Sequence, residues 1–178
     1  MSEKKRHEVS RMSELFTRLR NDDPGLGHVI DIGSGRGHLS RALALPPISA
    51  HVLAVDFDEG QKRGAERLDA LRYDALRSAT AIGSLTHIVR HLDKQSIKTI
   101  LKEWPHDSTV DAVGREEQGA MLVGLHACGD LTVDTLRAFV ELDGLEMERK
   151  MIAVGCCYTY LTRASQSLSA PPSALSSS

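Results

Sequence analysis

Short apolar segments alternate with longer amphipathic segments along most of this chain. Residues 3–20 place apolar side chains at helical spacing between charged ones, which predicts a helix that packs by one face. From residue 27 onward, near-continuous apolar runs of strand length are each followed by a segment of helical periodicity. The predicted strands are 28–32, 51–56, 85–92, 121–127 and 150–158, the predicted helices between them are 38–45, 59–79, 94–104 and 131–142, and 105–120 is a predicted loop.

The repeated alternation of strand and helix predicts an α/β fold. Strands that are apolar on both faces are typical of a parallel sheet covered by helices on both sides. Right-handed crossovers bring the carboxyl ends of such strands to one edge of the sheet, where ligands bind in folds of this class. Ligand-binding residues are therefore expected directly after the strands.

Length and charge narrow the class of protein further. The chain has 178 residues, which suits one domain, and a formal net charge of -2. Nucleic-acid-binding domains usually carry a clear basic excess, so we expect no DNA partner. The sequence shows no apolar run long enough for a membrane span and no secretory signal at its start, so no membrane partner is expected. Three cysteines do not suggest a disulfide framework, which favours a cytoplasmic or nuclear location.

A glycine-rich turn follows the first predicted strand. Gly33, Gly35 and Gly37 form the pattern G-x-G-x-G, whereas the dinucleotide-binding fingerprint G-x-G-x-x-G would have its third glycine in place of His38. In that fingerprint the start of the helix binds pyrophosphate. The spacing here favours a ligand without pyrophosphate; the alternative is an ordinary tight turn, which glycines also mark.

Acidic residues stand on both sides of this turn. Asp31 precedes the first glycine, and its carboxylate suits an ammonium group better than a pyrophosphate. Asp56 ends the second strand, where a carboxylate accepts hydrogen bonds from ribose hydroxyls. The arrangement fits S-adenosylmethionine, which has an amino-acid head, a sulfonium, a ribose and an adenine but no phosphate. Asp93 is expected either to meet the adenine amine or to cap a helix. The predicted cofactor-binding residues are Asp31, Gly33, Ser34, Gly35, Gly37, Asp56 and Asp93.

Four segments of the chain resemble, in order, a eukaryotic family of methyltransferase-like proteins: KKRHEV, DIGSGRGHLSRALA, GLHACGDLT and VGCCY. The family includes ribosomal-RNA adenine dimethylase domain-containing proteins and proteins of the methyltransferase-like protein 25 type. The resemblance implies a Rossmann-like class I methyltransferase fold, with three α/β/α layers, a mostly parallel sheet in the strand order 3-2-1-4-5, and S-adenosylmethionine as the cofactor.

The HACGD motif follows the fourth predicted strand, where class I methyltransferases face the methyl group. Enzymes that methylate adenine amines usually carry an Asn/Asp-Pro-Pro-Tyr/Phe clamp there, so these residues do not support adenine dimethylation. His126 is the predicted general base, needed where the methyl acceptor carries a proton, and Asp130 is predicted to orient it. The alternative is that His126 is structural and Asp130 caps the next helix.

The three cysteines raise the question of a metal. Cys128, Cys156 and Cys157, together with His126, have the chemistry of zinc ligands. The spacing lacks a CxxC pair, however, and adjacent cysteines on a strand point to opposite faces. Buried cysteine is also commonly a small apolar residue. We therefore predict no metal.

The N-terminal helix, residues 1–22, precedes the predicted cofactor-binding domain, residues 27–160. Lys4, Lys5 and His7 on this helix are expected either to contact the substrate or the cofactor's carboxylate, or to be solvated. A basic helix end is equally typical of both situations, so the sequence leaves these two alternatives open.

The C-terminal part of the chain predicts a shortened domain. A class I fold continues beyond its fifth strand with a helix and two more strands, whereas residues 163–178 are rich in Ser, Ala and Pro and are expected to be disordered. The apolar fifth strand would then lie at the edge of the sheet, where unpaired backbone groups recruit other chains. This predicts marginal stability, low activity and association with a partner or a second copy.

Two functional hypotheses follow. The first is an S-adenosylmethionine-dependent methyltransferase that acts on a macromolecule, RNA or protein, with activity impaired by truncation. The second is a non-catalytic, truncated methyltransferase-like protein with a binding or regulatory role. The small net charge argues mildly against RNA recognition by this domain alone.

Overall fold

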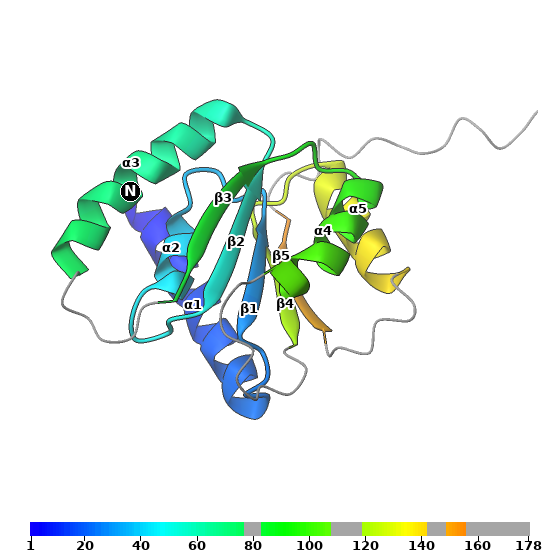
Figure 1. Cartoon of the computed structure of the whole chain (residues 1–178), viewed down its shortest axis with the longest axis horizontal. Helices are drawn as coiled ribbons and strands as arrows, with labels where there is room; N and C mark the ends of the chain where they lie inside the picture. The colour runs from blue at the N-terminus through cyan, green and yellow to red at the C-terminus, as the bar shows by residue number, and fades with distance from the viewer. Residues whose placement is uncertain (77–82, 108–118, 142–148, 156–178) are drawn as a thin grey trace, which may run out of the picture.

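The computed structural model describes residues 1–76, 83–107, 119–141 and 149–155 of the chain. In this part, a five-stranded parallel sheet lies between two layers of helices (Figure 1). The strands are β1 His28–Ile32, β2 His51–Asp56, β3 Leu85–Val89, β4 Ala120–Leu125 and β5 Arg149–Val154. The helices are α1 Glu3–Asp22, α2 His38–Ala44, α3 Glu59–Leu76, α4 Lys94–Asp107 and α5 Asp130–Val140.

The order of the strands is β3-β2-β1-β4-β5, and each neighbouring pair is parallel. The register aligns the strand starts, since His28 pairs with His51 on one side and with Ala120 on the other. The carboxyl ends therefore meet at one edge of the sheet. The predicted three-layer, Rossmann-like α/β architecture and its strand order are confirmed.

Alternate residues of the central strand β1 face the two helical layers. Val29 belongs to an apolar core with residues of α1 and α2, whereas Ile30 belongs to a second core with residues of α4 and α5. Figure 1 shows the same division, with α1, α2 and α3 on one side of the sheet and α4 and α5 on the other. All five residues of β1 are buried, so the strand is fixed on both faces and holds the turn that follows it.

A capping side chain fixes the start of helix α1, and its apolar face packs against the rest of the molecule. The Ser2 side chain accepts a hydrogen bond from the backbone N–H of Lys5 at 3.3 Å, which satisfies one of the free donors of the first turn. Val9, Met12 and Phe16 follow at helical spacing and are buried. These buried side chains pack α1 against α2 and the sheet.

Several predicted boundaries needed correction. Helix α4 continues through Pro105 to Asp107, where a loop was predicted, and β3 ends at Val89 rather than at residue 92. Residues 156–158 of the predicted fifth strand, and the predicted tail 163–178, lie outside the described residues. Within the described ranges, none of the helices combines the length and the apolar character needed to span a bilayer.

Candidate functional site

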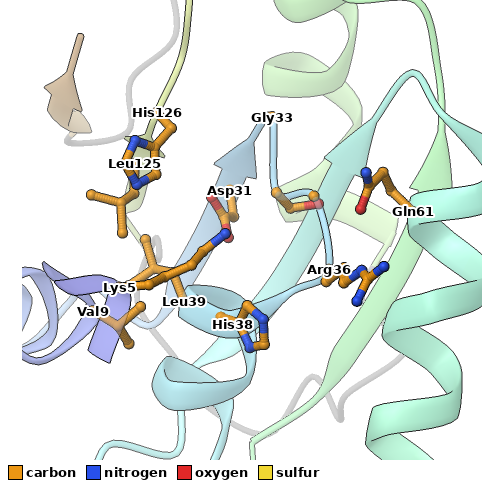
Figure 2. A pocket seen from close by; sticks show the side chains of 12 residues that line it. Lys5, Val9, Asp31, Gly33, Arg36, His38, Leu39, Gln61, Leu125 and His126 are labelled. Carbon is orange, nitrogen blue, oxygen red and sulfur yellow. The ribbon is translucent and has the colours of Figure 1, made fainter. Parts of the chain in front are cut away.

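A pocket of about 470 Å³ opens at the carboxyl edge of the sheet. This volume lies within the usual range for small-molecule sites. The lining side chains come from α1, β1, the glycine turn, α2, α3 and the end of β4, as Figure 2 shows. The lining residues are Lys5, Val9, Asp31, Gly33, Ser34, Gly35, Arg36, His38, Leu39, Gln61, Leu125 and His126.

The glycine turn joins β1 to α2 and needs left-handed backbone at alternate positions. Gly33, Gly35 and Gly37 have φ values of 70°, 54° and 66°, a region that side chains disfavour. A Cβ at Gly35 would meet nothing within 4 Å, so this part of the turn exposes bare backbone to the pocket. A Cβ at Gly37 would lie 2.8 Å from Cε1 of His87. Gly33, Ser34 and Gly35 line the pocket, where cofactor binding by them stays a prediction, whereas Gly37 allows close packing behind it.

Asp31 is the buried acid of the pocket, with only 2% of its surface exposed. Its Oδ2 accepts a hydrogen bond from the Ser40 hydroxyl at 2.5 Å. Burial raises the pKa of the Asp31 carboxyl from 3.8 to about 6, which the hydrogen bonds from Ser40 only partly offset. The positive charge of His87 also lowers this pKa, but burial outweighs it.

Asp56 braces the glycine turn from the end of β2. Its Oδ2 accepts a hydrogen bond from the backbone N–H of Gly35 at 2.8 Å, and its Oδ1 accepts one from Asp58 at 3.0 Å. The residue is 8% exposed and is not one of the pocket-lining residues given above. A carboxylate has further lone pairs, so ribose binding by Asp56 stays a prediction.

Asp93 has the capping role that the sequence analysis gave as its alternative. Its Oδ1 accepts a hydrogen bond from the backbone N–H of Ser96 at 2.7 Å, and the Ser96 hydroxyl accepts one from the N–H of Asp93 at 3.0 Å. This reciprocal pair is a capping box at the start of α4. The hydrogen bonds from Ser96 lower the pKa of the Asp93 carboxyl. Contact with an adenine amine stays a prediction.

His126 follows β4 and lines the pocket from the opposite side. Its backbone has a φ of 73°, the left-handed region that few residues other than glycine adopt. Its Nε2 lies 2.9 Å from Oε2 of Glu8 on α1. The structure pairs the ring with the Glu8 carboxylate, and orientation of the ring by Asp130 stays a prediction. The N-cap of α5 is Gly129, so Asp130 stands one position later than the predicted cap, in the first turn.

Basic side chains gather around the rest of the pocket. Lys5 extends from α1 toward Asp31, and Arg36 and His38 line the other side (Figure 2). Burial lowers the pKa of His38, and the positive charges of Lys5, Arg41 and Arg36 lower it further. A cationic lining thus lies opposite one buried carboxylate. Of the N-terminal basic residues, Lys5 is the one that lines the pocket.

A buried ionic network supports the turn from behind. Nε of Arg41 lies 2.5 Å from Oδ1 of Asp69, and Nε2 of His87 lies 2.7 Å from its Oδ2. Arg41 also donates to the backbone carbonyls of Arg36 and Ala65. Burial would raise the pKa of Asp69, but the bonds from His87 and Arg41 outweigh it and lower the pKa. The network links α2, α3 and β3 below the turn.

Of the three cysteines, only Cys128 falls within the part of the chain that the structure describes. The described residues contain no cluster of three or more His, Cys, Asp or Glu side chains placed to hold an ion. Cys128 is half-buried between β4 and α5. Cys156 and Cys157 lie outside the described residues.

The sequence analysis missed Glu8, Arg36, His38 and Gln61 as candidate site residues. Arg36 stands within the predicted turn and His38 directly after it, so their place in the turn was a usable signal. Glu8 stands within the KKRHEV segment, but its pairing could not be read from the sequence, because its partner lies 118 residues away.

Comparison with known proteins places this site in a family. A family model described as a methyltransferase domain matches residues 4–164. Two proteins named Probable methyltransferase-like protein 25, from Homo sapiens and Mus musculus, are 42% and 41% identical to the chain over 66 residues. That segment is 37% of this chain and 11% of each relative. The resemblance predicted from the four sequence segments is confirmed, and the chain belongs to this methyltransferase domain family.

Proposed function

We propose that this chain is an S-adenosylmethionine-dependent methyltransferase and that the pocket at the carboxyl edge of the sheet binds the cofactor. The observation that carries the proposal is the bare backbone of the glycine turn beside the buried Asp31, whose pKa is raised by burial. Family membership supports methyl transfer. The pocket supports a methyl donor that presents an ammonium group rather than a phosphate.

The lining residues fit the amino-acid head of the cofactor. Asp31 supplies a buried anion for the ammonium, and the extended Lys5 supplies a cation for the carboxylate (Figure 2). Helix α2 has only seven residues, and the buried acid stands at the foot of the turn before it. A pyrophosphate would meet this carboxylate unfavourably, so the same residues argue against a dinucleotide.

The nucleoside end has candidate residues along β2 and α3. Asp56 retains lone pairs for ribose hydroxyls while it holds Gly35. Phe57, the next residue, is 72% exposed at the end of β2 and offers an apolar face for an adenine ring. Gln61 lines the pocket from α3 and offers an amide to the same part of the ligand.

The methyl acceptor is expected to approach the His126 side of the pocket. The bound cofactor supplies an electrophilic methyl group, so the protein's tasks are to position the acceptor and to take up its proton. We assign the proton to His126 and keep Asp130 as a candidate to orient its ring. The acceptor is proposed to be a macromolecule, RNA or protein, and the location to be cytoplasmic or nuclear.

Isothermal titration calorimetry with S-adenosylmethionine and with NAD tests the proposal. We expect one equivalent of S-adenosylmethionine to bind and NAD not to bind. Binding of NAD alone would contradict the assignment of the cofactor. Binding of S-adenosylmethionine without methyl transfer to any acceptor would favour the alternative, a non-catalytic methyltransferase-like binding protein.

A further inference from the structure

We propose that Glu8 is a positioning residue for His126, and that the ring it holds takes the proton from a methyl acceptor through Nδ1. The inference rests on the proposed function and names the chemical class of the acceptor, a nitrogen or oxygen that carries a hydrogen. One side-chain contact between Glu8 and His126, the backbone conformation of His126 and the place of His126 in the pocket lining support it.

The contact between Glu8 and His126 joins the N-terminal helix to the end of β4. Oε2 of Glu8 lies 2.9 Å from Nε2 of His126, and the two side chains are 24% and 31% exposed. An ionised carboxylate can only accept a hydrogen bond, so Nε2 carries the hydrogen. In the neutral ring Nδ1 is then unprotonated and available as a base. The pair therefore selects one tautomer of the imidazole.

The backbone of His126 is held as firmly as its ring. Its φ of 73° is uncommon for a residue with a side chain, and such conformations persist where surrounding contacts impose them. Its N–H donates to the carbonyl of Val154 on β5 at 3.2 Å. Glu8 of α1 anchors the ring and Val154 of β5 anchors the backbone, and together they fix His126 at the pocket wall.

The proposed step couples methyl transfer to proton transfer. The acceptor atom forms a bond to the methyl carbon while the bond from that carbon to the sulfonium sulfur breaks, and the sulfur keeps the electron pair as a neutral thioether. The hydrogen of the acceptor passes as a proton to Nδ1 of His126. The imidazolium that results is stabilised by the Glu8 carboxylate. A tertiary amine, which has no hydrogen to give, would gain nothing from this pair.

Nuclear magnetic resonance tests the positioning role directly. Long-range ¹H–¹⁵N spectra of the labelled chain at about pH 8, where histidine rings are neutral, report which nitrogen carries the hydrogen. We expect His126, assigned with the His126→Gln variant, to carry it on Nε2 alone. Glu8→Ala should give a mixture of tautomers. Glu14→Ala, which removes another carboxylate of α1 that pairs with Arg11, should change nothing.

His87 is the internal control in the same spectra, because its Nε2 is held by Asp69 at 2.7 Å and should not respond to changes at Glu8. A hydrogen on Nδ1 of His126 in the wild type, or an unchanged tautomer in Glu8→Ala, would overturn the inference. Failure of the proposed function would appear separately, as an absence of S-adenosylmethionine binding by calorimetry.

Methyl transfer tests the proton-accepting role. With tritium-labelled S-adenosylmethionine and cell extract as the source of acceptors, Glu8→Ala should lower incorporation by about tenfold or more, with cofactor affinity unchanged. Glu8→Ala should have no further effect in the His126→Ala background. Additive effects of the two substitutions would overturn the proposal. So would a wild-type chain that binds the cofactor and transfers no methyl group to any fraction.

Discussion

Asp31 and Asp69 are two inward-facing carboxylates on the same side of the molecule, and their surroundings differ. Asp69 lies below the glycine turn between Arg41 and His87, whose hydrogen bonds lower its pKa. Asp31 lies in the pocket, is more deeply buried, and has the Ser40 hydroxyl as its side-chain donor. Burial raises its pKa to about 6.

The difference separates a structural carboxylate from a functional one. Opposite charges at hydrogen-bonding distance compensate the burial of Asp69, and the network braces the turn. The burial of Asp31 is not compensated in this way, which leaves a negative charge that a ligand cation can stabilise. We infer that the protein holds Asp31 at a cost in stability that a bound ammonium group recovers.

The largest expected effect is the loss of stability when the structural carboxylate, Asp69, is removed. Asp69→Ala leaves the buried Arg41 without its partner and should lower the free energy of unfolding by about 3–5 kcal/mol. Urea unfolding measures this change. The control is Glu66→Ala, which removes an exposed partner of Lys62 and should change stability by less than about 1 kcal/mol. Equal effects of the two substitutions would contradict the assignment of Asp69 as structural.

Asp31→Asn should raise the free energy of unfolding, whereas Asp69→Ala should lower it. The folded-state pKa of about 6 lies above the ordinary aspartate pKa of 3.8, so the ionised carboxylate destabilises the folded state at neutral pH by about 3 kcal/mol. The neutral amide should raise the free energy of unfolding by up to that amount. The advantage should shrink as the pH falls from about 6 toward 3.8, where the wild type becomes protonated. The variant should also lose affinity for S-adenosylmethionine; a less stable variant that binds normally would refute the comparison.

Asp56→Ala tests whether a second carboxylate, beside Asp31, contributes to cofactor affinity. The substitution removes the acceptor for the Gly35 N–H and for the predicted ribose hydroxyls, and should weaken S-adenosylmethionine binding by about 1.5–3 kcal/mol. Calorimetry of the purified variant measures the loss. Glu59→Ala, at the exposed start of α3, is the matched control and should bind as the wild type does. Unchanged affinity in Asp56→Ala would remove the ribose assignment.

The smallest expected effect is at Asp93. Asp93→Ala removes the capping box of α4 and should slightly lower the melting temperature. Because the contacts of its side chain are explained by the cap, S-adenosylmethionine affinity should stay unchanged. A clear loss of affinity would restore the adenine contact that the sequence analysis considered.

The sequence predicted the fold and the place of the site because both depend on local patterns. Apolar runs marked the strands, and the rule that ligands meet strand ends led to the glycine turn and to Asp31. The positions of Asp93 and Asp130 near helix starts left cap and ligand roles open, since acids favour both. The position of each acid in the sequence could not distinguish a helix cap from a ligand-binding residue.

Contacts between distant elements were beyond the reach of sequence patterns. Arg41, Asp69 and His87 come from two helices and a strand, and each looks like an ordinary polar residue in its own segment. Glu8 and His126 likewise meet only because α1 packs beside β4. Tertiary packing, rather than any local motif, brings these groups together.

The central claim is that the Asp31 carboxylate binds the ammonium group of the cofactor. Calorimetric titration of S-adenosylmethionine across pH 5 to 7, the range in which Asp31 titrates, tests this claim in buffers of different ionisation enthalpy. Above about pH 6 the affinity should be constant, and below it the affinity should fall by about tenfold per pH unit, with one proton released on binding. The Asp31→Asn variant should show neither the slope nor the proton release. An affinity that does not change between pH 5 and 7 in the wild type, with no proton released, would contradict the account.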